Sequence, residues 1–190
     1  MPSPSARGRP QASTHVALLR GVNVGGKNLL PMTELAGLFE AAGCARVRTF
    51  IQSGNVLLAA PAALARRLPD EIAARVEDRH GLRLRVIVRT AAELRRVASR
   101  NPFLRSGADP KRLHVAFLSA VPGRAAVARL DPARSPPDAF AVRGSEVYLS
   151  LPNGAGRTRL SNDYLERTLG TASTLRNWNT VVRLAALLGG

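Results

Sequence analysis

The sequence predicts an α+β protein made of two ferredoxin-like halves of the βαββαβ type, packed into one body. Apolar strand-like runs and amphipathic helical runs alternate in the first half in the order strand, helix, strand, strand, helix, strand. Two segments of the second half echo the first in the same order, which indicates a duplication. The echoes pair HVALLRGVNVGG (15–26) with HVAFLSAVPGR (114–124), and FIQSGNVLLAAP (50–61) with FAVRGSEVYLSLP (140–152).

The leading strand of each half is apolar on both faces, at 16–19 (VALL) and 115–118 (VAFL). A sheet with one face open to water alternates apolar and polar residues instead. We therefore expect both sheets to be covered on both faces, by the other half or by another chain.

Local patterns define each element of the first half. Gly21 closes an apolar run, Pro31 suits a first helical turn and Gly43 suits a helix end. Ser53-Gly54 is typical of a tight connection between two strands. The predicted elements are strands at 15–20, 46–52, 55–59 and 82–89 and helices at 31–43, 61–79 and 91–99.

The chain divides into four parts. The proline-, serine- and arginine-rich start predicts a disordered arm, and a Pro/Gly-containing connector joins the halves. Helices are expected near 161–169 and 180–188. The parts are an arm at 1–14, the first ferredoxin-like half at 15–99, a connector at 100–112, and a second βαββα half with a C-terminal helix at 113–190.

Composition excludes several classes of protein. The chain of 190 residues is 45% hydrophobic and 22% charged, as in folded globular proteins. No apolar run approaches the length of a membrane span, and the N-terminus lacks the apolar core of a secretory signal. The single cysteine, Cys44, excludes an intramolecular disulfide framework and a cysteine-rich zinc site. We expect a cytoplasmic protein without a membrane partner.

The formal charge of +15 allows two interpretations. Of 28 basic residues only Lys27 and Lys111 are lysines, so the other 26 are arginines, a bias typical of GC-rich coding DNA. The arginines are scattered and form no block of the kind that marks a nucleic-acid arm. The first interpretation is a solvated basic surface. The alternative is a surface that attracts polyanions.

The most distinctive segment is the loop after the first strand, RGVNVGGKN at 20–28. It matches the phosphate loop GxxxxGK[ST] at Gly21, Gly26 and Lys27, but Asn28 replaces the hydroxyl that holds Mg²⁺. The helix also begins too late to cradle a phosphate beside Lys27. Nucleotide hydrolysis is therefore not expected. The backbone N–H groups of the glycines are instead expected to form an anion-binding nest. A turn set by glycine geometry alone is the alternative.

Topology places further polar residues beside this loop. The first two strands run parallel in a βαββαβ unit, so the loop and the 52–55 hairpin should share one rim of the sheet. A second polar segment around the only tryptophan offers a closing wall, with Trp178 stacking on a ligand ring. Its alternatives are a core role for Trp178 and helix capping by Asn179 or Thr180. The candidate ligand-binding residues are Arg20, Asn23, Gly25, Gly26, Lys27, Asn28, Gln52, Ser53, Asn55, Arg176, Asn177, Trp178 and Asn179.

No motif identifies a reaction, a metal or a cofactor. His15, His80 and His114 show no metal-ligand spacing, and Ser53 lies in no GxSxG elbow. Cys44 lies among alanines and is expected to pack. We predict no metal site and no cofactor, and the catalytic residues stay unknown.

Two long segments carry a family resemblance. ALLRGVNVGGKNLLPMTELAGLFEAAGCARVRTFIQSGNVLL at 17–58 closely resembles the opening signature of the bacterial family known as domain of unknown function 1697. TRLSNDYLERTLGTASTLRNWNTVVRLAALL at 158–188 resembles its closing signature. The resemblance implies an α+β fold of two ferredoxin-like halves. It implies no activity, because the family has none assigned.

Three functional hypotheses follow. The first is a cytoplasmic protein that binds a small phosphate- or carboxylate-bearing ligand, with any reaction and the oligomeric state left open. The second is a nucleic-acid-binding module that acts through charge, although its first and third strands carry no aromatic residue for base stacking. The third is a structural or interaction protein without a ligand.

Overall fold

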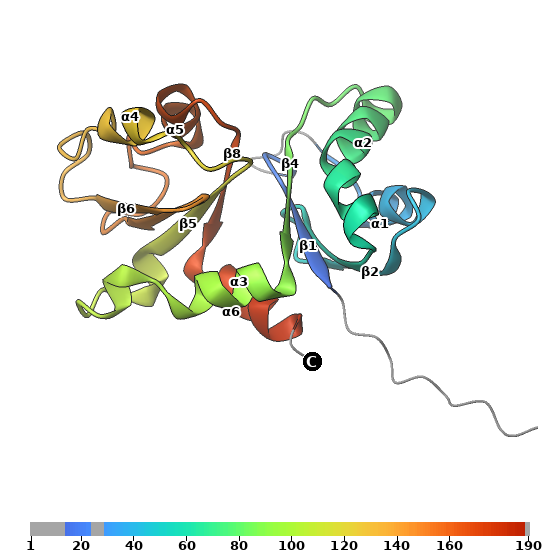
Figure 1. Ribbon diagram of the computed structural model, residues 1–190, viewed down its shortest axis with the longest axis horizontal. Coiled ribbons are helices and arrows are strands. Elements are labelled where there is room, and N and C mark those ends of the chain that lie inside the picture. The colour runs from blue at the N-terminus through green and yellow to red at the C-terminus, as the bar shows by residue number, and fades with distance from the viewer. Residues whose placement is uncertain (1–13, 24–28, 189–190) are drawn as a thin grey trace, which may run out of the picture.

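The computed structural model describes residues 14–23 and 29–188 and contains two four-stranded antiparallel sheets with helices around them (Figure 1). The first half of the chain forms β1 (His15–Leu19), α1 (Met32–Ala41), β2 (Ala45–Phe50), β3 (Asn55–Ala59), α2 (Ala62–His80), β4 (Val86–Thr90) and α3 (Ala91–Ser99). Two short 3-10 turns, η1 (Pro102–Leu104) and η2 (Pro110–Arg112), follow. The second half forms β5 (Leu113–Leu118), α4 (Arg124–Ala128), β6 (Ala139–Arg143), β7 (Glu146–Ser150), α5 (Asn162–Leu169), β8 (Ser173–Asn177) and α6 (Trp178–Leu187).

The two sheets have the same strand order. The first is β2-β3-β1-β4 and the second is β6-β7-β5-β8, so the leading strand of each half is an inner strand. Ala17 of β1 pairs with Val56 and Val88, while Ala116 of β5 pairs with Val147 and Leu175. Apart from His15 and His114, both leading strands are apolar, as expected for inner strands of sheets that are covered on both faces.

Three apolar cores cover both faces of both sheets. One face of the first sheet packs against α1 and α2, with Phe39 and Ile72 buried there. One face of the second sheet packs against α5, where Leu165 is buried. The remaining faces meet α3 and α6 in a central core that includes Phe117 and Trp178. The expectation of sheets covered on both faces is therefore confirmed, and α3 and α6 pack side by side at the junction (Figure 1).

Both junction helices begin directly after a strand, at a polar cap. Thr90 and Glu93 form a capping box at α3, with the Glu93 amide donating to Thr90 Oγ1 at 3.1 Å. Asn177 caps α6, accepting from the Thr180 amide at 2.8 Å. The expected cap at Asn179 or Thr180 was wrong, because the helix begins at Trp178.

The structure adds one strand to those expected. Residues 173–177 form β8, which pairs with β5 and fills the position that β4 holds beside β1. β4 also starts at Val86 rather than at residue 82. Within residues 14–23 and 29–188, no helix is both long and apolar enough to cross a membrane.

Candidate functional site

A cavity of about 330 Å³ lies where the end of β1, the β2–β3 turn and the β8–α6 junction meet. We call it the β1–β8 cavity. Arg20 and Ser53 from the first half and Arg176 and Asn177 from the second line it. All four belong to the candidate set from the sequence, so the structure brings together residues from the rim and from the proposed closing wall.

Arg176 reaches from β8 into the first half of the chain. Its residue is 8% exposed, and all three guanidinium nitrogens donate hydrogen bonds to neutral acceptors. The acceptors are Asn55 Oδ1 for Nε (2.6 Å), the carbonyl oxygens of Leu19, Ser53 and Gly54 for Nη2 (2.8, 3.1 and 3.2 Å), and Leu175 O and Thr174 Oγ1 for Nη1 (both 2.9 Å).

The charge of Arg176 has no carboxylate partner among the described residues. Burial lowers the pKa of the guanidinium to about 10, so the group still carries its charge at neutral pH. Carbonyl and amide dipoles solvate this charge without cancelling it. The wall of the β1–β8 cavity therefore carries a positive charge.

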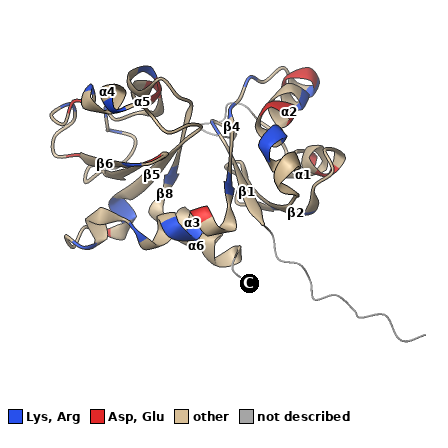
Figure 2. Ribbon diagram, in the orientation of Figure 1, with Lys and Arg blue, Asp and Glu red and all other residues tan. Residues whose placement is uncertain are grey.

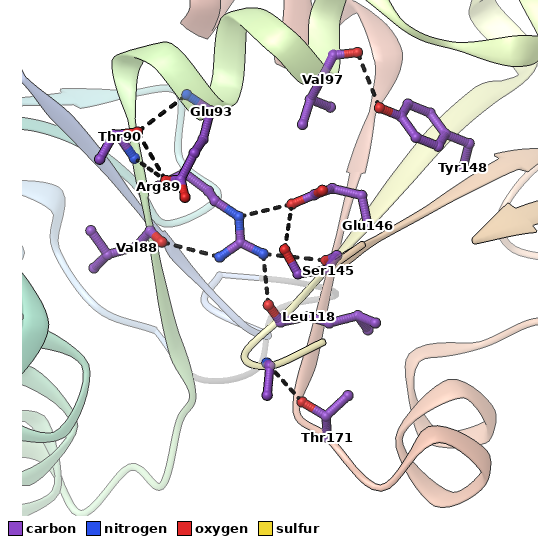
Figure 3. A network of polar contacts seen from close by, with 11 residues as sticks. Val88, Arg89, Thr90, Glu93, Val97, Leu118, Ser145, Glu146, Tyr148 and Thr171 are labelled. Carbon is purple, nitrogen blue, oxygen red and sulfur yellow. Dashed lines mark hydrogen bonds and ion pairs between the residues drawn. The ribbon is translucent and has the colours of Figure 1, made fainter. Parts of the chain in front are cut away.

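Arg89 makes the corresponding contacts in the opposite direction, from β4 into the second half (Figure 3). Its Nη2 donates to Leu118 O at 2.7 Å and Ser145 O at 3.2 Å. Its Nε lies 2.9 Å from Glu146 Oε1, which makes a buried ion pair. Arg89 is thus neutralised by a carboxylate, and Arg176, opposite the amide of Asn55, is not.

Arg20 joins the two halves at the rim of the cavity. Its guanidinium forms ion pairs with Asp163 and Glu166 of α5. The Arg20 side chain is 27% exposed, so solvent and a ligand can both reach it. Because two carboxylates face this one guanidinium, Arg20 positions α5 and adds N–H donors to the rim but no net positive charge.

Two amides offer free donors to the cavity. Asn177 uses its Oδ1 as the α6 cap, and Asn162 uses its Oδ1 to accept from Ser173 Oγ at 2.8 Å. Both residues line the β1–β8 cavity, and neither Nδ2 has an acceptor within 14–23 and 29–188. Asn162 was absent from the candidate set, since it looks like part of an ordinary helix start in the sequence.

Ile51 lies at the same cavity with an unusual backbone. Its φ is +50°, in the left-handed region that β-branched residues avoid, and the residue is 52% exposed. Such a conformation costs about 1–3 kcal/mol and persists only where the surroundings impose it. The fold therefore holds the β2–β3 turn in this conformation at the edge of the cavity. Nothing in the local sequence pattern signals it.

Two predicted ligand residues are used inside the fold instead. Asn55 is fully buried behind Arg176, and its Nδ2 donates to Phe50 O at 3.1 Å and Ser53 Oγ at 3.2 Å. Asn23 donates to Leu30 O at 3.0 Å and accepts from the Leu30 amide at 2.8 Å. Both amides therefore hold loops in place.

Three of the remaining candidates do not join the cavity wall. Gln52 and Asn179 are exposed and are not among its lining residues. Trp178 is 4% exposed in the central core, so it serves as a core anchor and the stacking role was wrong. Gly25, Gly26, Lys27 and Asn28 lie outside the described residues.

Burial shifts the pKa of both histidines in the leading strands and of the single cysteine. Burial lowers the pKa of His15 and of His114, which keeps both imidazoles neutral at pH 7. Burial, with a smaller contribution from Glu71, raises the pKa of the Cys44 thiol to about 11 and leaves it unreactive. No metal-binding group of three His, Cys, Asp or Glu side chains occurs in the described part of the chain.

These features define a class: an α+β protein of two four-stranded antiparallel sheets with a donor-rich cavity between its halves. The chain belongs to the family described as "Protein of unknown function (DUF1697)", whose model matches residues 12–148. This confirms the resemblance read from the sequence, although the tail at 158–188 lies beyond the match. A search of curated proteins finds no match.

A solved structure shares the fold. It is that of the conserved bacterial protein SP0830 from Streptococcus pneumoniae, with a TM-score of 0.66 and 18% sequence identity. The similarity covers 94% of this chain and 99% of that one. At this identity the likeness concerns the fold alone.

Proposed function

We propose that this protein binds a small ligand with a phosphate or carboxylate group in the β1–β8 cavity. The observation that carries the proposal is Arg176, a buried guanidinium at the cavity wall with no carboxylate partner in the described structure. An uncompensated buried charge is costly, and an anion in the adjoining cavity would offset that cost.

The neighbouring groups suit the same ligand. Asn162 and Asn177 present free amide N–H groups, and Ser53 adds a hydroxyl. The N-terminus of α6 also lies directly after its cap Asn177, so its partial positive charge adds to the charge of Arg176. Oxygens of a phosphate or carboxylate accept hydrogen bonds from all of these donors.

We also propose that the two halves are duplicated ferredoxin-like units. The support is the shared strand order and the equivalent placement of Arg89 and Arg176, which pair with Val16 and Val115 in the two inner strands.

A cytoplasmic location is part of the same proposal, with the unpaired, buried Cys44 as its support.

The test uses inorganic phosphate and a panel of small carboxylates and sugar phosphates in a thermal-shift assay, followed by calorimetry. A ligand at a hundred times its Kd stabilises the fold by about 2.7 kcal/mol. Asn177→Asp keeps a good helix cap but puts a negative charge at the cavity. We expect this variant to fold normally and to lose at least about tenfold in affinity, the loss of roughly one charge-assisted hydrogen bond.

Asn179→Asp is the matched control. It makes the same change of charge in the first turn of the same helix, at an exposed position outside the cavity. Its affinity should stay close to that of the wild type. Equal losses in both variants, or no stabilisation by any anion in the panel, would overturn the proposal.

A further inference from the structure

Four arginines from separate segments gather on a second surface, away from the β1–β8 cavity. Arg96 lies on α3, Arg100 ends that helix, Arg105 follows η1 and Arg143 ends β6. They line two adjoining cavities of about 540 and 380 Å³, and both Arg100 and Arg143 line both of them. Blue segments along α3 and the connection after it mark part of this surface in Figure 2.

None of the four guanidinium groups has a hydrogen bond or an ion pair within residues 14–23 and 29–188, and all four residues are exposed. Three of them are close enough to act together on one group. Burial and the charge of Glu146 raise the pKa of the Tyr148 hydroxyl to about 12, while Arg143, Arg100 and Arg96 act to lower it. Like charges held around shared hollows repel one another, and a bound anion would remove that repulsion.

The two carboxylates at these cavities already have other partners (Figure 3). Glu146 accepts from Arg89 at 2.9 Å and from Ser145 Oγ at 3.0 Å. Glu93 Oε2 accepts from the Thr90 amide at 2.8 Å and from Thr90 Oγ1 at 2.9 Å. Glu146 is neutralised by Arg89, and the single charge of Glu93 interacts with Arg89 and Arg96, so the four arginines keep an excess of positive charge on this surface.

We propose that this surface binds a ligand with several phosphates in a row. One phosphate would occupy a single hollow, whereas two hollows that share Arg100 and Arg143 match a longer chain of anionic groups. Arginine suits this task because its planar fork binds phosphate oxygens in pairs. The phosphates can belong to a free oligophosphate or to the backbone of single-stranded nucleic acid, since both present the same chemistry.

The experiment measures binding of inorganic tripolyphosphate by calorimetry and of a labelled single-stranded oligonucleotide by fluorescence anisotropy. The test variant is Arg100→Gln/Arg143→Gln, and both positions are exposed, so the fold should be retained. The control is Arg67→Gln/Arg183→Gln, which changes net charge equally at exposed positions outside both cavities. Two lost charge-assisted contacts should weaken binding at least about tenfold in the test variant and little in the control.

Each outcome decides a point. If the test variant loses binding to both probes and the control does not, the result supports binding at this surface. It also identifies nucleic-acid backbone as an accepted source of phosphates. Selective loss for tripolyphosphate, with no oligonucleotide binding by the wild type, supports a free oligophosphate. Equal losses in the two double variants, or binding of neither probe by the wild type, would overturn the proposal, because net charge alone would then explain any affinity.

Discussion

Arg89 and Arg176 occupy corresponding positions in the two sheets, but they differ in charge balance. Each lies on the edge strand that pairs with the leading strand of its own half. Each donates to carbonyl oxygens of the opposite half. Arg89 meets the carboxylate of Glu146, and Arg176 meets the amide of Asn55. The first pair is electrically neutral. The second leaves a positive charge at a cavity, so the same architecture serves cohesion on one side and, as we propose, ligand binding on the other.

The largest expected effect is on folding. Arg176→Met removes the donors of six hydrogen bonds and leaves the carbonyl oxygens of the opposite half without partners. Arg89→Met also leaves the Glu146 carboxylate unpaired, with 15% of its side chain exposed. Each variant should lower the free energy of unfolding by about 3–5 kcal/mol. Urea denaturation measures this, and a loss below about 1 kcal/mol would mean that the crossing arginines do not hold the halves together.

A smaller effect should follow when the charge balance alone is changed. Glu146→Gln turns the Arg89 site into a copy of the Arg176 site, with the hydrogen bond kept and the ion pair lost. Because charged hydrogen bonds exceed neutral ones by about 1 kcal/mol or more, we expect a loss of about 1–2 kcal/mol in urea denaturation. An unchanged free energy of unfolding would contradict the view that Glu146 neutralises Arg89.

Asn55→Asp is the reciprocal change. It gives Arg176 a carboxylate but removes the bonds from Asn55 Nδ2 to Phe50 O and Ser53 Oγ. These effects oppose each other, so stability should change less than in Glu146→Gln. Stabilisation by inorganic phosphate should disappear, since the charge that attracts the anion would be neutralised inside the fold.

The sequence predicted the regular elements of the first half well. β3 has the predicted bounds, because the apolar run 55–59 is buried and bounded by a turn. α3 also has them, since Thr90 caps it locally. β8 was missed because its residues are polar, and Thr174 and Arg176 are buried against partners from the opposite half. Local patterns contain no information on such partners.

The candidate site was predicted in outline for a similar reason. The order of strands is enough to bring Arg20 and Ser53 to one rim, and this follows from the sequence. The roles of individual side chains do not follow from the order of strands. Asn55 and Trp178 looked like ligand residues, yet both are buried. Which polar residue faces a cavity and which supports it depends on distances between segments that only the folded structure defines.

The smallest expected effect concerns pH and involves His15 in β1 and His114 in β5. The two histidines hold equivalent positions, since each pairs with a leucine of the neighbouring strand. Burial lowers the pKa of both, partly offset by Glu93 at His15 and by the Arg112 backbone at His114. The folded pKa lies below the unfolded value near 6.5, so between the two the unfolded chain binds more protons.

Stability linked to either histidine is therefore complete above about pH 6.5 and is lost as the pH falls through the folded pKa. His15→Gln and His114→Gln should each flatten the decline in unfolding free energy between pH 7 and pH 5 measured by urea denaturation. A steeper decline in either variant would mean that the imidazole is stabilised in its charged form, contrary to its burial.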